Sequence, residues 1–152
     1  MNICIIPARG GSKRIPRKNI KLFCGKPMIE WAIAAAQSAD IFERIFVSTD
    51  DAEIKETVLS LGVEAPFKRP EYLSDDFATT IDVMAHAVST LGLDNESTVC
   101  CLYATAPFLQ PEKLAIGPEK LNHADFAMSV TSYAFPIQRA LRAKSLDQVE
   151  MI

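Results

Sequence analysis

The first 29 residues of this chain contain no acidic side chain, although the chain as a whole is acidic. The 152 residues include 16 Lys and Arg against 19 Asp and Glu, which gives a formal net charge of −3. A patch of one sign on a protein of the other sign can attract a polyanionic small molecule. No second basic stripe follows, so we expect no nucleic-acid partner. The cations of the opening segment are Arg9, Lys13, Arg14, Arg17, Lys18, Lys21 and Lys26.

Long apolar runs are also missing. Nowhere do about eighteen apolar residues follow one another, the length that a membrane-spanning helix needs. The opening run from Ile3 to Ile6 is too short for the hydrophobic region of a signal peptide, and no basic residue precedes it. We therefore expect a cytoplasmic protein with no membrane partner.

The chain is poor in patterns that form disulfides or zinc sites. Its four cysteines show neither a C-x-x-C pair nor the spacing of a disulfide framework, which favours reduced, structural thiols. Cys4 and Cys100 lie in segments predicted to be buried strands. His86 and His123 are too far apart in sequence to suggest a zinc site.

Two common nucleotide-binding signatures are absent. The sequence contains neither G-x-x-x-x-G-K-[ST] nor G-x-G-x-x-G. A Walker-type ATPase and a dinucleotide-binding oxidoreductase therefore lose support.

Strand and helix patterns alternate along the chain. Short apolar runs predict strands at residues 2–8, 44–48, 63–67, 98–103 and 126–132. Helical spacing and caps predict helices at residues 27–39, 52–61, 80–91 and 111–122, the last interrupted by Gly117-Pro118. No linker divides the chain, so we expect a single domain over residues 1–152. The alternation predicts an α/β fold with a mostly parallel sheet and helices on both faces.

Three polar motifs follow predicted strands. They are the loop Arg9–Asn19, Ser48-Thr-Asp-Asp51 and Tyr103-Ala-Thr-Ala-Pro107. Parallel sheets bind ligands at the carboxyl ends of their strands, so we expect the three motifs to converge on one crevice. In the loop, Gly10 and Gly11 allow backbone amides to approach phosphate oxygens. The alternative is a solvated cationic loop, but glycines and cations together at a strand end are more than solubility requires.

The motifs resemble those of a known family. They match the acylneuraminate cytidylyltransferases (CMP-sialic acid synthetases), and the resemblance runs through nearly the whole chain. Phe23–Ile29 together with Tyr103–Phe108 is most similar to the pseudaminic acid cytidylyltransferase branch. The resemblance implies a three-layer, Rossmann-like nucleotide-diphospho-sugar transferase fold. The stretches that carry it are Arg9–Asn19, Gly25-Lys-Pro-Met28, Val47-Ser-Thr-Asp50, Arg69-Pro70 and Ser74-Asp-Asp76.

The resemblance also implies an activity. Family members transfer CMP from CTP to the anomeric hydroxyl of a nine-carbon keto-sugar acid, with Mg²⁺ and release of pyrophosphate, in surface glycan biosynthesis. Pseudaminic acid is the favoured sugar and N-acetylneuraminic acid the next. Two alternatives stay open: a CTP-binding module without turnover, and a cytidylyltransferase for another keto-sugar acid.

Site residues follow from the same resemblance. Arg9 and Lys18 would contact the phosphates as catalytic residues. Arg69 and Thr80 fall where the family reads cytosine. Tyr103 stands where sialic acid synthetases place a glutamine, and it would contact the sugar together with Gln138. The full nucleotide-binding set would be Ala8, Arg9, Gly10, Gly11, Ser12, Lys18, Asn19, Arg69, Ala78 and Thr80.

Each residue has a simpler explanation when it is taken alone. Arg69 reads as a loop arginine before a turn proline, and Thr80 as a helix cap. Asp50 reads as an N-cap carboxylate and Ser74–Asp76 as solvated turn residues. Only their joint occurrence after the basic loop favours the functional interpretation.

Family members continue beyond the position of Ile152. Their later part carries the aspartates that bind Mg²⁺ and a dimerisation element, so the full-length family is expected to be homodimeric. We therefore expect this chain to be a truncated form or a fragment, with its metal ligands unknown. Val149–Ile152 has the pattern of a strand.

Overall fold

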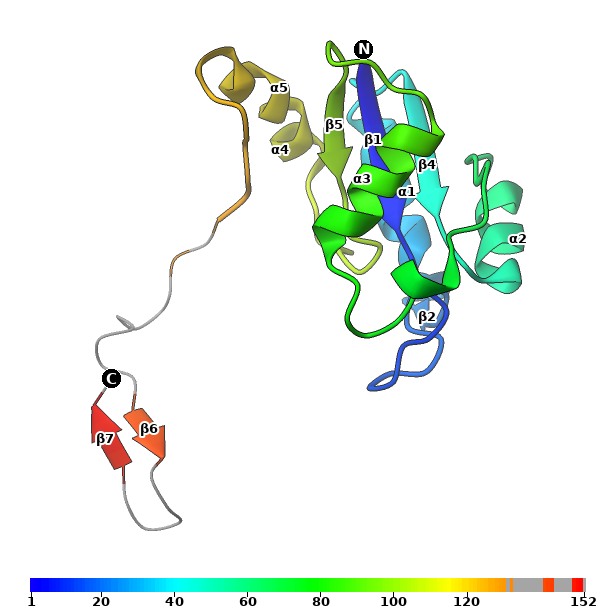
Figure 1. Cartoon of the computed structure of the whole chain (residues 1–152), viewed down its shortest axis with the longest axis vertical. Helices are drawn as coiled ribbons and strands as arrows, with labels where there is room; N and C mark the ends of the chain where they lie inside the picture. The colour runs from blue at the N-terminus through cyan, green and yellow to red at the C-terminus, as the bar shows by residue number, and fades with distance from the viewer. Residues whose placement is uncertain (131, 133–140, 144–148, 152) are drawn as a thin grey trace.

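The computed structural model describes residues 1–130, 132, 141–143 and 149–151. A three-stranded parallel sheet lies at its centre, in the order β4-β1-β5 (Figure 1). β1 (Asn2–Pro7) pairs on one side with β4 (Arg44–Ser48) and on the other with β5 (Thr98–Cys101). The parallel α/β architecture is therefore confirmed, and the strand at residues 44–48 has the predicted bounds.

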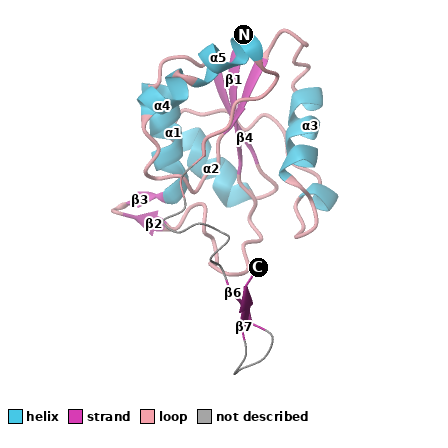
Figure 2. Cartoon of the chain, turned by 90° about the vertical axis from the view of Figure 1, so that its left-hand side faces the viewer, coloured by secondary structure: helices cyan, strands magenta, loops and turns pink. Residues whose placement is uncertain are grey.

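Helices cover both faces of this sheet (Figures 1 and 2). Successive side chains of a strand point to opposite faces. Cys4 and Ile6 of β1 pack in one cluster with α1 (Met28–Ser38) and α2 (Ala52–Ser60). Ile3 and Ile5 pack in a second cluster with Ala87 of α3 (Thr80–Thr90). These two clusters make the three layers that the resemblance implied.

Short elements complete the described part. An antiparallel hairpin precedes α1, and a second antiparallel pair includes Val149–Met151, where a strand was predicted. The predicted helix at 111–122 is interrupted before Gly117-Pro118, as expected. The bounds are β2 (Leu22–Phe23), β3 (Lys26–Pro27), η1 (Glu71–Leu73), α4 (Pro111–Ala115), α5 (Gly117–Lys120), η2 (Leu121–His123), β6 (Leu141–Ala143) and β7 (Val149–Met151).

The strand predicted at residues 63–67 is wrong. This segment runs parallel to β4 but makes only isolated bridges, Phe46 with Glu64 and Thr49 with Lys68. Pro66 lies between the two bridges. Proline has no N–H to donate, so a continuous ladder cannot form across it.

The strand predicted at residues 126–132 is also wrong for its described residues, none of which is in a strand. Phe126, Met128 and Val130 alternate along the sequence, which predicts a strand with one buried face. Instead all three are more than three quarters exposed, at 84%, 80% and 85%. Alternation gives a strand only where a neighbouring strand pairs with it, and no described strand does so here.

The cysteines are free, and Cys4 is fully buried. β5 is less buried than predicted: Cys100 is half-buried and Cys101 exposed. The reason is that β5 has a neighbour on one side only among the described strands. A hydrogen bond with the Cys100 thiol, together with burial, raises the pKa of Cys4, which fits a structural rather than a reactive thiol. No helix in the described part has the length and apolar content needed to cross a membrane.

Candidate functional site

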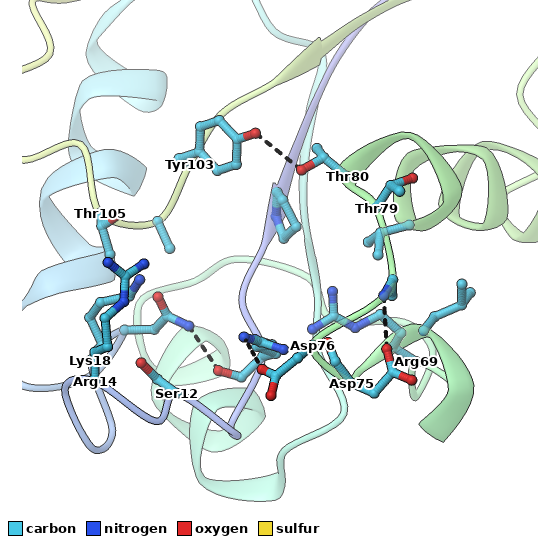
Figure 3. Close-up of a pocket in the computed structure, with 17 residues that line it drawn as sticks. Ser12, Arg14, Lys18, Arg69, Asp75, Asp76, Thr79, Thr80, Tyr103 and Thr105 are labelled. Carbon is cyan, nitrogen blue, oxygen red and sulfur yellow. Dashed lines mark hydrogen bonds and ion pairs between the residues drawn. The ribbon is translucent and has the colours of Figure 1, made fainter. Parts of the chain in front are cut away.

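A cavity of about 460 Å³ lies at the carboxyl ends of β1 and β5. Three segments line it: the basic loop after β1, the chain from Arg69 to the start of α3, and the loop after β5 (Figure 3). Its volume is within the range of small-molecule sites, roughly 300–1,000 Å³. Two of the three motifs therefore converge as predicted. Ser48–Asp51 does not line the cavity, but Asp50 contacts Arg69, which does.

The basic loop supplies cations to one side of the cavity. Arg14 and Lys18 lie together there, and Ser12 faces the same space (Figure 3). Arg9 and Asn19 also line the cavity. Asn19 is buried, and its Nδ2 donates to the Arg9 carbonyl oxygen at 2.9 Å, so this side chain holds the shape of the loop.

Ala8, Gly10 and Gly11, all predicted for the nucleotide site, do not line the cavity. Ala8 is buried, and its N–H donates to the Ser48 carbonyl. Gly10 is required for space, because a Cβ there would lie 2.4 Å from Asp51 Oδ2. The Gly10 N–H donates to Asp50 Oδ1 at 3.1 Å, so in this structure it is bonded within the protein.

Arg17 is turned away from the cavity. Its guanidinium binds both oxygens of Asp51, at 2.5 and 2.9 Å, and also Glu53. The backbone of Arg17 has φ 55°, a left-handed conformation that is uncommon for a residue with a Cβ. This bidentate pair holds the pKa of Asp51 at about 2 and raises that of Arg17. Arg17, counted among the cations for phosphate, is therefore a structural residue of the loop.

Asp76 faces the cavity from the opposite segment and joins two cations of the basic loop. Its Oδ1 lies 2.8 Å from Arg9 Nη2, and its Oδ2 contacts Lys13 Nζ. Arg9 also donates to the Asp75 carbonyl oxygen. Lys13 and Arg9 lower the pKa of Asp76, which keeps this carboxylate charged. Ser74–Asp76, taken alone, was interpreted as a solvated turn. In the structure its residues Asp75 and Asp76 are bound to the basic loop.

Arg69 lies deep in the cavity wall and is only 3% exposed. Its Nη2 lies 3.4 Å from Asp50 Oδ1, and its Nε has no hydrogen-bond partner among the described residues. A buried cation is costly unless it is paired, so this guanidinium requires acceptors. The explanation of Arg69 as an ordinary loop residue is wrong.

The start of α3 places the hydroxyl of Thr80 at the cavity. Thr79 caps the helix and forms a capping box with Asp82. Thr80 is therefore not the cap, and its hydroxyl lies 3.1 Å from the Tyr103 hydroxyl across the cavity (Figure 3). Ala78 lines the same wall.

Some of the predicted site could not be placed, and some lining residues were missed. Gln138 lies outside the described residues. Leu73 and Val83 line the cavity although nothing in the sequence distinguished them from core residues. Thr105 was within the Tyr103–Pro107 motif, and its place after a strand was the signal that marked it.

Metal ligands are not gathered in the described part of the chain. No group of three or more His, Cys, Asp or Glu side chains is placed there to hold an ion. The carboxylates that line the cavity are Asp75 and Asp76. Asp76 is engaged by two cations, and Asp75 accepts the N–H groups of Phe77 and Ala78.

The sequence profile of a family described as "Cytidylyltransferase" matches residues 3–151. The chain belongs to the cytidylyltransferase family. It is 47% identical, over 99% of its own length, to a pseudaminic acid cytidylyltransferase of Campylobacter jejuni, and it spans only 66% of that protein. It is 36% identical to N-acylneuraminate cytidylyltransferase A of Danio rerio over 78% of the chain and 27% of that protein.

A solved structure supports the fold of this chain. A CMP:2-keto-3-deoxy-manno-octonic acid synthetase complexed with CTP matches with a TM-score of 0.68. The match covers 81% of this chain and 48% of the other at 23% identity, so it shows the nucleotidyltransferase fold alone.

Proposed function

We propose that this chain contains the CTP-binding part of an enzyme that transfers CMP to a nonulosonic acid. The anomeric hydroxyl oxygen of the sugar would form a bond to the α-phosphorus of CTP. The bond from that phosphorus to the oxygen that bridges it to the β-phosphorus would break, and pyrophosphate would leave with the electron pair. The proton of the sugar hydroxyl would pass to the surrounding water. The observation that carries the proposal is a cavity at the carboxyl ends of parallel strands, lined by Arg9, Arg14, Lys18 and the buried Arg69.

Charge is the main obstacle to this reaction. A sugar carboxylate must approach a triphosphate, and the leaving pyrophosphate gains negative charge as the bond breaks. Arg9 and Lys18 lie where they can neutralise phosphate oxygens, and Ser12 offers a hydroxyl beside them. These residues bind and orient the triphosphate, and they stabilise the leaving group.

The opposite wall supports recognition of cytosine. Arg69, Ala78 and Thr80 line it; the family resemblance assigns Arg69 and Thr80 to the base and Ala78 to the nucleotide site. Arg69 has an unpaired Nε among the described residues, and the Thr80 hydroxyl can both donate and accept. A few fixed polar contacts of this kind suit a base that is read by its hydrogen-bonding edge.

Pseudaminic acid is the sugar that we favour, with N-acetylneuraminic acid next. The relatives with 47% identity are named pseudaminic acid cytidylyltransferases. Tyr103 lines the cavity beside the proposed cytosine site, and its aromatic ring can pack on the apolar face of a deoxy sugar.

We also propose that the complete enzyme uses Mg²⁺ and works in the cytoplasm. Mg²⁺ bound to phosphates would reduce their negative charge, and it prefers carboxylate and phosphate oxygens as ligands. The described part gathers no group of three or more metal-ligating side chains, and no step above depends on the metal. The free cysteines fit a reducing compartment. A homodimer is expected only from the family resemblance.

The test is pyrophosphate release from CTP with Mg²⁺, using pseudaminic acid and N-acetylneuraminic acid in parallel, together with CTP binding by calorimetry. We expect CTP binding, and faster release with pseudaminic acid if the chain turns over. In Arg9→Ala, CTP should bind roughly 10- to 100-fold more weakly, because a charge-assisted contact is lost. Glu56→Gln, on the exposed face of α2, serves as the control.

The outcomes separate the alternatives. Binding of CTP without release would identify a nucleotide-binding module that lacks turnover. Release of pyrophosphate with another keto-sugar acid, but with neither pseudaminic acid nor N-acetylneuraminic acid, would reassign the sugar. Failure to bind CTP would overturn the proposal.

A further inference from the structure

Asp50 occupies a position that the proposed reaction leaves unexplained. It follows β4, and it does not line the cavity. The sequence offers a simple reason for its presence, namely that it caps α2. The structure removes that reason, because Asp51 is the N-cap residue and accepts the Ile54 N–H at 3.0 Å.

One oxygen of Asp50 holds two parts of the site. Asp50 Oδ1 accepts the Gly10 N–H at 3.1 Å, and the same oxygen lies 3.4 Å from Arg69 Nη2. Gly10 belongs to the basic loop on one side of the cavity, whereas Arg69 belongs to the opposite wall. The Asp50 side chain is 26% exposed, so water competes only in part with these contacts.

Arg69 depends on this carboxylate. Burial lowers the pKa of Arg69 and the positive charge of Arg9 acts in the same direction, while Asp50 opposes both. The structure shows no other ion pair to Arg69 among the described residues. Without Asp50, the guanidinium would lie at 3% exposure with no anion beside it, and it would move toward water or toward another acceptor.

We propose that Asp50 is a positioning residue for nucleotide binding. It fixes the basic loop and Arg69 relative to each other, so that the phosphate-facing and base-facing walls are set at one separation before the nucleotide arrives. The proposal rests on the proposed function for the identity of the ligand. The structural part of the proposal, that Asp50 contacts both Gly10 and Arg69, does not depend on the proposed function.

Two substitutions in the full chain separate the contacts. Asp50→Asn keeps an oxygen for the Gly10 N–H but removes the charge that faces Arg69, whereas Asp50→Ala removes both. We expect CTP to bind about 3- to 10-fold more weakly in Asp50→Asn and about 10- to 100-fold more weakly in Asp50→Ala. Glu64→Gln breaks the surface pair with Arg44 and is the matched control, with unchanged affinity expected.

A double-mutant cycle tests whether Asp50 acts through Arg69. Asp50→Asn added to Arg69→Ala should weaken CTP binding by no more than about twofold beyond Arg69→Ala alone, because Asn still accepts the Gly10 N–H and the cation that the charge faced is already gone. Additive losses would overturn the coupling. Equal losses in Asp50→Asn and Asp50→Ala would overturn the role of Gly10.

A ligand-free measurement keeps the two proposals distinguishable. In NMR spectra, the Gly10 amide should exchange faster with solvent in Asp50→Ala, and the Arg69 Nε–H signal should shift in both variants but not in Glu64→Gln. Wild-type chain that binds no CTP would overturn the proposed function. Unchanged Gly10 and Arg69 signals would overturn the positioning role of Asp50, whatever the wild-type chain binds.

Discussion

Single side chains show that several cations of the basic loop and of the cavity wall are already paired within the chain. Arg9 and Lys13 share Asp76, Arg17 binds Asp51, and Arg69 faces Asp50. We therefore expect the proposed triphosphate to compete with the carboxylate of Asp76 for Arg9. The positive charge counted from the sequence overstates the charge that is free to bind.

Asp76→Asn should tighten CTP binding. The substitution frees Arg9 and Lys13 and removes a negative charge from the cavity wall. We expect a gain of about 3- to 10-fold, a modest value because these groups are partly exposed. Calorimetry with CTP measures it, with Glu71→Gln as a control in the same segment. Weaker binding in Asp76→Asn would show that this carboxylate contributes to the site.

Thr80→Val should relax the preference for CTP over UTP while it leaves triphosphate affinity largely intact. The hydroxyl that faces the proposed base position is lost, but the basic loop is untouched. Tyr103→Phe removes the partner of that hydroxyl and should change nucleotide preference in the same direction by a smaller factor. Competition binding of CTP and UTP measures both, and unchanged selectivity in Thr80→Val would mean that cytosine is read elsewhere.

The sequence predicted which residues face the cavity better than it predicted what they contact. Arg9 and Lys18 were found from the basic loop that follows a strand, and Thr80 was found from the family resemblance. Their partners in the chain could not be found in this way. A pair such as Arg9 with Asp76 joins residues 67 positions apart, and no local pattern encodes such a contact.

At the scale of elements, the start of α2 combines two functions in one carboxylate. Asp51 caps the helix and also binds Arg17 of the basic loop. Its pKa of about 2 lies below the ordinary value of 3.8. The charged form is therefore stabilised in the folded state. This contribution is complete above about pH 4 and is lost as the pH falls through about 2.

Asp51→Asn should lower the free energy of unfolding by about 2 kcal/mol at neutral pH. The difference in the free energy of unfolding between Asp51→Asn and the wild-type chain should shrink as the pH falls from 4 to 2. The reason is that the wild-type carboxylate then becomes protonated. Urea unfolding followed by circular dichroism at several pH values measures this. Glu56→Gln on the same helix should show no such convergence. A difference that stays constant down to pH 2 would contradict the depressed pKa.

Elements were predictable where local signals agreed with their neighbours. The strand at 44–48 and the helices around it were found from apolar patterns and caps. Residues 63–67 failed because Pro66 interrupts the ladder. Residues 126–130 failed for another reason, since a strand also needs a partner and the sequence does not name one.

At the scale of the whole molecule, the exposed apolar residues have a consequence. Phe126, Met128 and Val130 form an alternating apolar row that no described residue covers. Such surfaces promote association. We expect the 152-residue chain to self-associate at micromolar concentration, and the triple change to serine to reduce this in sedimentation velocity. Ala127→Ser, in the same segment, is the control. Equal association in all three proteins would place the contact elsewhere.

The position of β1 at the centre of the sheet has a consequence for how the site comes into being. β1 precedes both of its neighbours in the chain, and it pairs with strands that come much later. Parallel neighbours need long crossovers, so their pairing is slow compared with local helix formation. The last wall of the cavity, Tyr103 to Thr105, follows the last of these strands. A growing chain that has emerged only as far as α3 therefore holds the cations of the basic loop but no complete cavity. We expect the proposed nucleotide to stabilise the domain only after β5 has joined β1.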